Sequence, residues 1–151
     1  MGKATDPGPG PDRHWRAVAS KFQTIGDREQ RHEQSGLDDA ETVVVAFGTA
    51  AKFVEYVVRG LRADGHKVGW FRPVTLWPFP GAALTAATKN AGRVLVYELN
   101  AGQMLDDVRM YAADRSAIRF IGGVSIAESG LAYGELLDAP VIRSLILEAS
   151  R

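Results

Sequence analysis

The pattern of apolar and polar positions changes near residue 41 and divides the chain into two parts. Before that point, apolar side chains recur three or four positions apart, which predicts an amphipathic helix that starts at Asp12 and needs a surface to lie on. After it, short apolar runs alternate with stretches of helical spacing, a pattern typical of βαβ units in a mostly parallel sheet. The apolar positions of the predicted N-terminal helix are Trp15, Val18, Ala19, Phe22 and Ile25.

The second part predicts a doubly wound α/β domain of three layers with four or five strands. The segment 42–47 is apolar throughout, as a strand covered on both faces must be. Segment 124–134 is mixed in character and is expected to be a loop. The predicted strands are 42–47, 68–71, 93–98 and 117–121, and the predicted helices are 50–63, 82–90, 103–113 and a last one from Pro140 with Val141, Ile142, Leu145 and Ile146 facing inward.

The domain organisation follows from the same pattern. Residues 1–11 are rich in glycine and proline, so they are expected to be a disordered lead or a cloning remnant. Residues 12–40 form a linker with the predicted helix and an edge strand near 28–33. Residues 41–151 are then the folded domain.

Composition excludes several classes of function. Eighteen basic and eighteen acidic residues give no net charge, so no global field attracts nucleic acid or an anionic membrane. The absence of cysteine removes disulfides, thiolate nucleophiles and the ligands of iron–sulfur clusters. No apolar run approaches the roughly 20 residues that span a bilayer, and we expect a cytoplasmic protein.

Two loops at the carboxyl ends of the predicted strands are candidate ligand sites, because ligands of such sheets bind at that edge. Gly48 and Thr49 open a helix, where free amides attract an anion, although a helix cap and a turn are the favoured interpretation. Asn100, Gly102 and Gln103 open another helix, and capping is the favoured role for Asn100.

A third loop is the most distinctive segment of the chain and predicts a docking surface. Three prolines rigidify the sequence RPVTLWPFP at positions 72–80, while Trp77 and Phe79 offer large apolar faces. The alternative is that these aromatic rings cover the core. Arg72 is expected to pair with a substrate carboxylate or with Glu98 on what we take to be the adjacent strand.

No catalytic or metal-binding constellation emerges from the sequence. The histidines, at positions 14, 32 and 66, fall in separate predicted elements. Ser125 and Ser129 lack the context of an activated nucleophile. Asp106 and Asp107 lie where acidic residues favour a helix dipole, so they need not bind a metal.

In combination, these motifs resemble the α subunits of 2-oxoacid:ferredoxin oxidoreductases, especially those acting on 2-oxoglutarate or 2-oxoisovalerate. The resemblance covers roughly residues 15–120, including a linker at 21–39. The motifs that carry it are VAFGTA at 45–50, KVG at 67–69, RPVTLWPFP at 72–80, ELNAGQM at 98–104 and DVR at 107–109.

The resemblance implies the transketolase-like C-terminal domain of such a subunit. Family members decarboxylate a 2-oxoacid oxidatively on thiamine diphosphate and Mg²⁺, pass electrons through iron–sulfur clusters to ferredoxin, and form acyl-coenzyme A. The pyrimidine-binding domain and the Gly-Asp-Gly motif are absent here, so this chain alone is expected to bind none of these cofactors and to be inactive. The implied partners are a thiamine-binding β subunit, a ferredoxin-like subunit and a second copy of the chain.

The leading hypothesis is therefore a non-catalytic scaffold that docks other subunits through Arg72, Trp77, Phe79 and Glu98. A second hypothesis is a freestanding domain that binds coenzyme A, a nucleotide or a carboxylate at the edge formed by Gly48, Thr49 and residues 100–103. A third is a self-associating module without a ligand.

Overall fold

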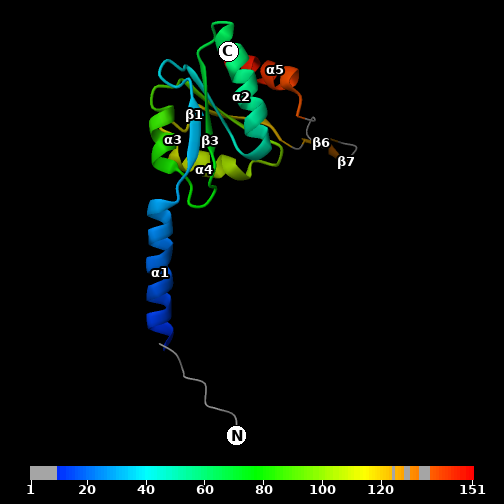
Figure 1. The fold of residues 1–151 in the computed structure, drawn as a ribbon. Helices are drawn as coiled ribbons and strands as arrows, with labels where there is room; N and C mark the ends of the chain where they lie inside the picture. Colours follow the sequence, from blue (N-terminus) through cyan, green and yellow to red (C-terminus); the bar gives the residue numbers. More distant parts are fainter. Residues whose placement is uncertain (1–9, 124, 128–129, 133–136) are drawn as a thin grey trace.

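The chain forms a body of sheet and helices from which one long helix extends (Figure 1). The computed structural model describes residues 10–123, 125–127, 130–132 and 137–151. The extending helix is α1, Gly10–Arg28. Among the described residues, no helix is both long enough and apolar enough to cross a membrane.

A five-stranded sheet lies at the centre of the body, with strand order β1-β3-β2-β4-β5. Neighbouring strands from β3 to β5 run parallel, and β1 pairs antiparallel with β3 at one edge. The sheet is thus mostly parallel, as the alternation of strands and helices predicted. The strands are β1 His32–Ser35, β2 Thr42–Ala46, β3 Val68–Pro73, β4 Arg93–Glu98 and β5 Ile118–Gly122.

Helices cover both faces of the sheet and complete three layers (Figure 1). On one face, α2 (Gly48–Ala63) and α5 (Ala139–Ala149) enclose a core that includes Leu61, Ile142 and Ile146. On the other face, α3 (Gly81–Thr88) and α4 (Gln103–Tyr111) enclose a second core around Phe71 and Leu84. The doubly wound arrangement is confirmed.

The position of β2 at the centre of the sheet explains why its sequence is continuously apolar. Every residue of β2 is buried, because alternate side chains point to opposite cores. Val44 contributes to the core under α2, and Val43 and Val45 contribute to the core under α3 and α4.

The N-terminal boundaries differ from those that the sequence predicted. Helix α1 begins at Gly10, because a proline in the first turn needs no hydrogen-bonded amide, so residues 10 and 11 do not belong to a disordered lead. Asp12 lies inside that first turn and pairs with Arg16 at 2.9 Å. Residues 1–9 lie outside the described residues. The edge strand begins at His32 rather than near Arg28, since the helix continues through Arg28.

The C-terminal part also differs from the prediction. Strands β6 (Ser125–Ala127) and β7 (Gly130–Ala132) pair antiparallel within the segment expected to be a loop. Three residues are too few for an alternating pattern to be recognised. In α5, Ile142 and Ile146 are fully buried, whereas Leu145 is partly buried against the same core.

Removing a core side chain should destabilise the domain strongly. Leu61 in α2 is fully buried, so Leu61→Ala should lower the free energy of unfolding by about 2–5 kcal/mol through lost burial and a residual cavity. Urea denaturation followed by circular dichroism measures this change. Tyr56→Ala on the exposed side of the same helix is the matched control and should change stability by about 0.5 kcal/mol or less. Equal effects of both substitutions would contradict the assigned core.

Candidate functional site

The carboxyl ends of the four parallel strands meet at one edge of the sheet, which we call the carboxyl edge. Along it, the end of β2 lies between the ends of β3 and β4. Arg72 on β3 and Glu98 on β4 are therefore not on neighbouring strands, and the expected pair between them does not form. The segments 72–80 and 98–104 nevertheless both start from this edge.

Glu98 is a charged residue with no exposed surface at the last position of β4. Its two carboxylate oxygens accept hydrogen bonds from the amides of Met104 and Leu105, both at 2.9 Å. These amides belong to the first turn of α4, which has no intrahelical acceptors for them. The carboxylate therefore ties the end of a strand to the start of the following helix.

Asn100 accepts hydrogen bonds from the two backbone amides that precede those of Met104 and Leu105. Its Oδ1 accepts hydrogen bonds from the amides of Gly102 at 2.8 Å and Gln103 at 3.2 Å. Asn100 thus bonds the first amide of α4 from a position before the N-cap residue, which is Gly102. Four successive amides at the start of α4 thus bind side chains of the chain itself and are not free to hold an anion at the candidate site of residues 100, 102 and 103.

Two glycines, Gly122 and Gly123, let the end of β5 lie close to the end of β4. The amide of Gly123 donates to the Glu98 carbonyl oxygen at 2.7 Å. Both Gly122 and Gly123 have positive φ, and a Cβ at Gly122 would lie 2.8 Å from that same oxygen. Larger residues would push β5 away from the end of β4.

The start of α2, the other candidate ligand site, is more open. Gly48 has a φ of 59°, and nothing lies within 4 Å of where its Cβ would be. Thr49 does not cap the helix, because the N-cap residue is Phe47. No side chain among the described residues makes a capping hydrogen bond there. Both Gly48 and Thr49 are exposed.

Arg72 lies within β3 and pairs with the edge strand. Its guanidinium donates to Glu33 of β1 at 2.8 Å, and these residues are direct register partners. The buried Arg72 Nε has no hydrogen-bond partner among the described residues. In this structure Arg72 therefore fixes the antiparallel strand rather than facing outward at the edge.

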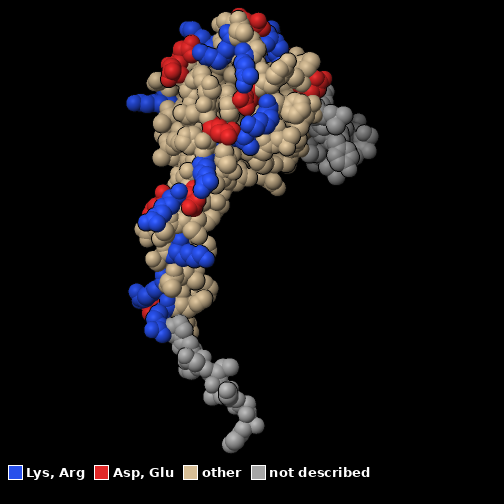
Figure 2. Space-filling view, in the orientation of Figure 1, with Lys and Arg blue, Asp and Glu red and all other residues tan. Residues whose placement is uncertain are grey.

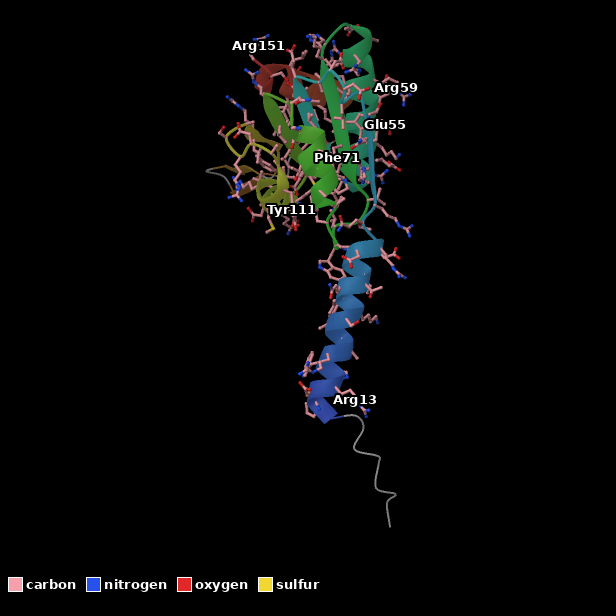
Figure 3. The ribbon with its side chains drawn as sticks, turned by 90° about the vertical axis from the view of Figure 1, so that its left-hand side faces the viewer. Arg13, Glu55, Arg59, Phe71, Tyr111 and Arg151 are labelled. Carbon is pink, nitrogen blue, oxygen red and sulfur yellow. The ribbon has the colours of Figure 1, made fainter. Side chains whose placement is uncertain are left out.

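The loop after β3, residues 74–80, combines buried and exposed apolar side chains. Phe79 is buried and its ring stacks on Tyr111 of α4 with centroids 5.6 Å apart, so it covers the core. Figure 3 places Tyr111 in the body of the molecule, next to the sheet. Val74, Leu76 and Trp77 are exposed, and Trp77 is 61% exposed. The peptide bond between Trp77 and Pro78 is cis.

Hydrogen bonds hold this loop in place. Thr75 Oγ1 donates to the Pro78 carbonyl at 2.9 Å and accepts from the Arg31 amide at 3.0 Å. The Val74 amide donates to the Arg31 carbonyl at 2.9 Å. Trp77 in turn meets Phe22 of α1 edge to face, with ring centroids 5.4 Å apart. The exposed apolar side chains consequently lie on a fixed loop beside α1.

The donor groups present do not fit the cofactors that the family resemblance implies. The chain has no cysteine to ligate an iron–sulfur cluster. Within the described ranges, no group of three or more His, Asp or Glu side chains is arranged to hold a metal ion. Asp106 pairs with Arg109 at 3.2 Å, and burial, followed by the nearby Asp106 carboxylate, raises the pKa of Asp107.

Sequence reasoning placed the candidate loops at the carboxyl edge, where the structure also has them, but missed the bonds within that edge. Trp77 and Asn100 were identified from their residue types and positions. The roles of Thr75 and of Glu98 as an amide acceptor depend on contacts that no local pattern records. A glutamate directly after an apolar strand was the available signal for a buried acceptor.

The fold and this edge define a doubly wound α/β domain with a rigid, partly apolar rim. A model of the pyruvate:ferredoxin oxidoreductase core domain II family matches residues 40–129, more than half of the chain. The chain therefore belongs to this family.

Similar proteins are subunits of 2-oxoacid oxidoreductases. The ketoisovalerate oxidoreductase subunit VorB of Methanothermobacter thermautotrophicus is 37% identical over 98 residues, which are 65% of this chain and 28% of that protein. The 2-oxoglutarate synthase subunit KorA of the same organism is 28% identical over 144 residues, 93% of this chain and 36% of that protein. The chain thus spans about a third of these relatives.

The fold also matches a solved structure. The 2-oxoglutarate:ferredoxin oxidoreductase from Magnetococcus marinus, with 2-oxoglutarate, coenzyme A and succinyl-CoA bound, aligns over 100% of this chain and 26% of that chain. The TM-score is 0.72 at 23% sequence identity. This likeness supports the fold found here, with its mostly parallel sheet.

Replacing the Glu98 carboxylate should loosen the start of α4. Glu98→Gln exchanges one acceptor oxygen for a donor that faces an amide, so we expect a loss of about 1–3 kcal/mol in unfolding free energy. Hydrogen exchange of the Met104 and Leu105 amides should accelerate. The exposed Glu148→Gln is the control and should leave both quantities near wild type. Unchanged protection of the two amides in Glu98→Gln would contradict the assigned bonds.

Proposed function

We propose that this domain is a non-catalytic scaffold that docks other polypeptides of a 2-oxoacid:ferredoxin oxidoreductase through its carboxyl edge. The observation that carries the proposal is the exposure of Val74, Leu76 and Trp77 on a loop whose backbone is fixed by hydrogen bonds. A rigid exposed aromatic ring binds a partner with little loss of conformational entropy. Leu99, exposed at the end of β4, extends the apolar area along the same edge.

The buried residues of this edge support the proposal in another way. Glu98 and Phe79 have almost no exposed surface, so they would hold the loops in shape instead of touching a partner. Arg72, paired with Glu33, would keep the edge strand in register. The interface itself would consist of the exposed apolar side chains.

In this proposal the chemistry belongs to the complete complex. Oxidative decarboxylation of a 2-oxoacid to acyl-coenzyme A would use thiamine diphosphate, Mg²⁺, iron–sulfur clusters and coenzyme A on other domains and subunits. The proposed partners are a thiamine-binding β subunit, a ferredoxin-like subunit and a second copy of this chain. Membership of the family and the resemblance to subunits VorB and KorA support this assignment.

Trp77→Ser should weaken association with the thiamine-binding subunit. Loss of a central aromatic contact costs about 2 kcal/mol or more, or about 30-fold in Kd. The experiment co-purifies the chain with the thiamine-binding subunit of an oxidoreductase that acts on 2-oxoglutarate or ketoisovalerate, and then measures Kd by interferometry. Tyr56→Ser, an equally exposed aromatic change on α2, is the matched control.

The pattern of these results decides the proposal. Wild type and Tyr56→Ser should bind alike, and Trp77→Ser should bind weakly while retaining its unfolding midpoint. Failure of the folded wild-type chain to associate with any thiamine-binding subunit would count against a scaffold role.

The freestanding ligand-binding domain is retained as a second candidate because of the start of α2. Its uncapped amides at Gly48 and Thr49 are exposed, and an anion could approach them. The occupied amides of α4 weigh against a wider anion site along the edge.

A thermal-shift screen with coenzyme A, nucleotides and 2-oxoglutarate separates the two candidates. A ligand at about 100 times its Kd adds about 2.7 kcal/mol of stability, which would raise the melting temperature by several degrees. The scaffold proposal predicts no shift with any of these compounds. A shift with any one of these compounds would instead favour the ligand-binding candidate.

A further inference from the structure

Helix α1 is long and apolar on one side, and it meets the body through the contact of Phe22 with Trp77. It has 19 residues, and none of them is buried by the described parts of the chain. Trp15 is 65% exposed and Phe22 52% exposed. An isolated helix of this length is only marginally stable in water, so such a helix gains its stability from packing. Figure 3 places Arg13 near its free end, far from the sheet.

The apolar residues of α1 repeat with the spacing of a helix–helix contact. Trp15, Val18, Phe22 and Ile25 are separated by three, four and three positions, the pattern of two successive heptads. We call these four residues the α1 seam. A strand or an irregular segment would not match this period, whereas a second helix would.

The two borders of the α1 seam differ in charge and size. On one side, His14, Lys21 and Arg28 recur every seven residues and form a basic border. On the other side Asp12, which pairs with Arg16, is followed every seven residues by Ala19 and Gly26, and these two small residues allow a partner backbone to approach closely. Lys and Arg side chains recur along α1 in Figure 2. The seam is thus apolar in the middle and positive along one edge.

The body of the domain extends this seam. Trp77 packs edge to face on Phe22, so the exposed apolar loop continues the apolar side of the helix. The contacts of Arg31 with Thr75 and Val74 fix the end of α1 to the same loop. A helix lying on the seam would therefore also reach the exposed face of Trp77.

We propose that the α1 seam is the docking site for an amphipathic α-helix that carries carboxylates along one flank. Opposite charges across such a contact select partner and orientation. The inference rests on the proposed function for the origin of the partner helix, which would belong to the parts of the oxidoreductase outside this chain. The aligned region is only 26% of the chain of the solved relative, so ample polypeptide remains to supply it.

A second copy of α1 fits this seam less well. In an antiparallel pair the basic borders would face each other and repel. In a parallel pair, Lys21 would face Gly26 and His14 would face Ala19, so no carboxylate would meet the basic border. Charge complementarity thus favours a different, acidic helix.

Two synthetic peptides test the inference with the full chain. Both are helices of about three heptads with leucine at the core positions and no aromatic residue, and they carry either glutamate or lysine at the flanking positions. Binding is followed by the tryptophan emission of the chain, in which Trp15 and Trp77 are exposed and Trp70 is buried. The glutamate peptide should bind at least about tenfold more tightly than the lysine peptide.

Two variants identify the contact. Trp15→Ser combined with Phe22→Ser should weaken binding of the glutamate peptide at least about tenfold. Lys21→Glu combined with Arg28→Glu should reverse the preference, so that the lysine peptide binds more tightly. All four side chains are exposed, so both variants should keep the wild-type unfolding midpoint.

Every other outcome contradicts the inference. Equal binding of the two peptides, no binding, or binding that the double charge reversal does not change would overturn it. So would a dimer in sedimentation that Trp15→Ser with Phe22→Ser abolishes, or binding to vesicles of anionic phosphatidylglycerol in the absence of binding to either peptide. The assay contains no oxidoreductase subunit, so its failure is distinct from failure of the chain to associate with the thiamine-binding subunit.

Discussion

The carboxylate of Glu98 connects the sheet to the loops that give the domain its outer shape. It is fully buried at the end of β4 and accepts the amides of Met104 and Leu105. Its backbone carbonyl accepts the amide of Gly123, which fixes the end of β5 as well. A charge without contact to water is tolerated at this position because both oxygens find donors at a helix start, where the dipole favours a negative group. The start of α4 is consequently held by bonds within the chain, and its first amides are occupied.

The sequence determined the body of the domain more reliably than its margins. Segments 42–47 and 93–98 were predicted closely, because strands covered on both faces must be continuously apolar. The ends of the helices were not predicted closely, because a shift of one turn leaves the apolar pattern unchanged. The hairpin β6–β7 was missed, because a pair of three-residue strands has no distinct pattern. The edge strand was predicted at about 28–33, displaced toward the N-terminus of its observed place at His32–Ser35, since α1 and β1 follow each other within a few polar residues.

The candidate site was predictable in its location and not in its contacts. Parallel topology alone directs attention to the loops after β2, β3 and β4. Which of their side chains face outward depends on tertiary packing: Phe79 and Trp77 are two positions apart in one loop, yet one is buried on Tyr111 and the other is exposed beside Phe22. Arg72 was expected to bind a substrate or Glu98, and it binds Glu33, because the strand order places β2 between the two strands in question.

The body and α1 differ in how far their apolar side chains are covered by the chain itself. Each face of the sheet is covered by two helices of the chain itself, so both cores of the body are enclosed. In α1 no described residue is buried, and its apolar side continues through the Phe22–Trp77 contact onto a loop held by hydrogen bonds and ring contacts. At the carboxyl edge the first amides of α4 are bonded by Asn100 and Glu98, whereas the start of α2 is exposed and has no side-chain cap among the described residues. What the edge offers outward is apolar area in a fixed geometry, which is the property that a partner helix can use.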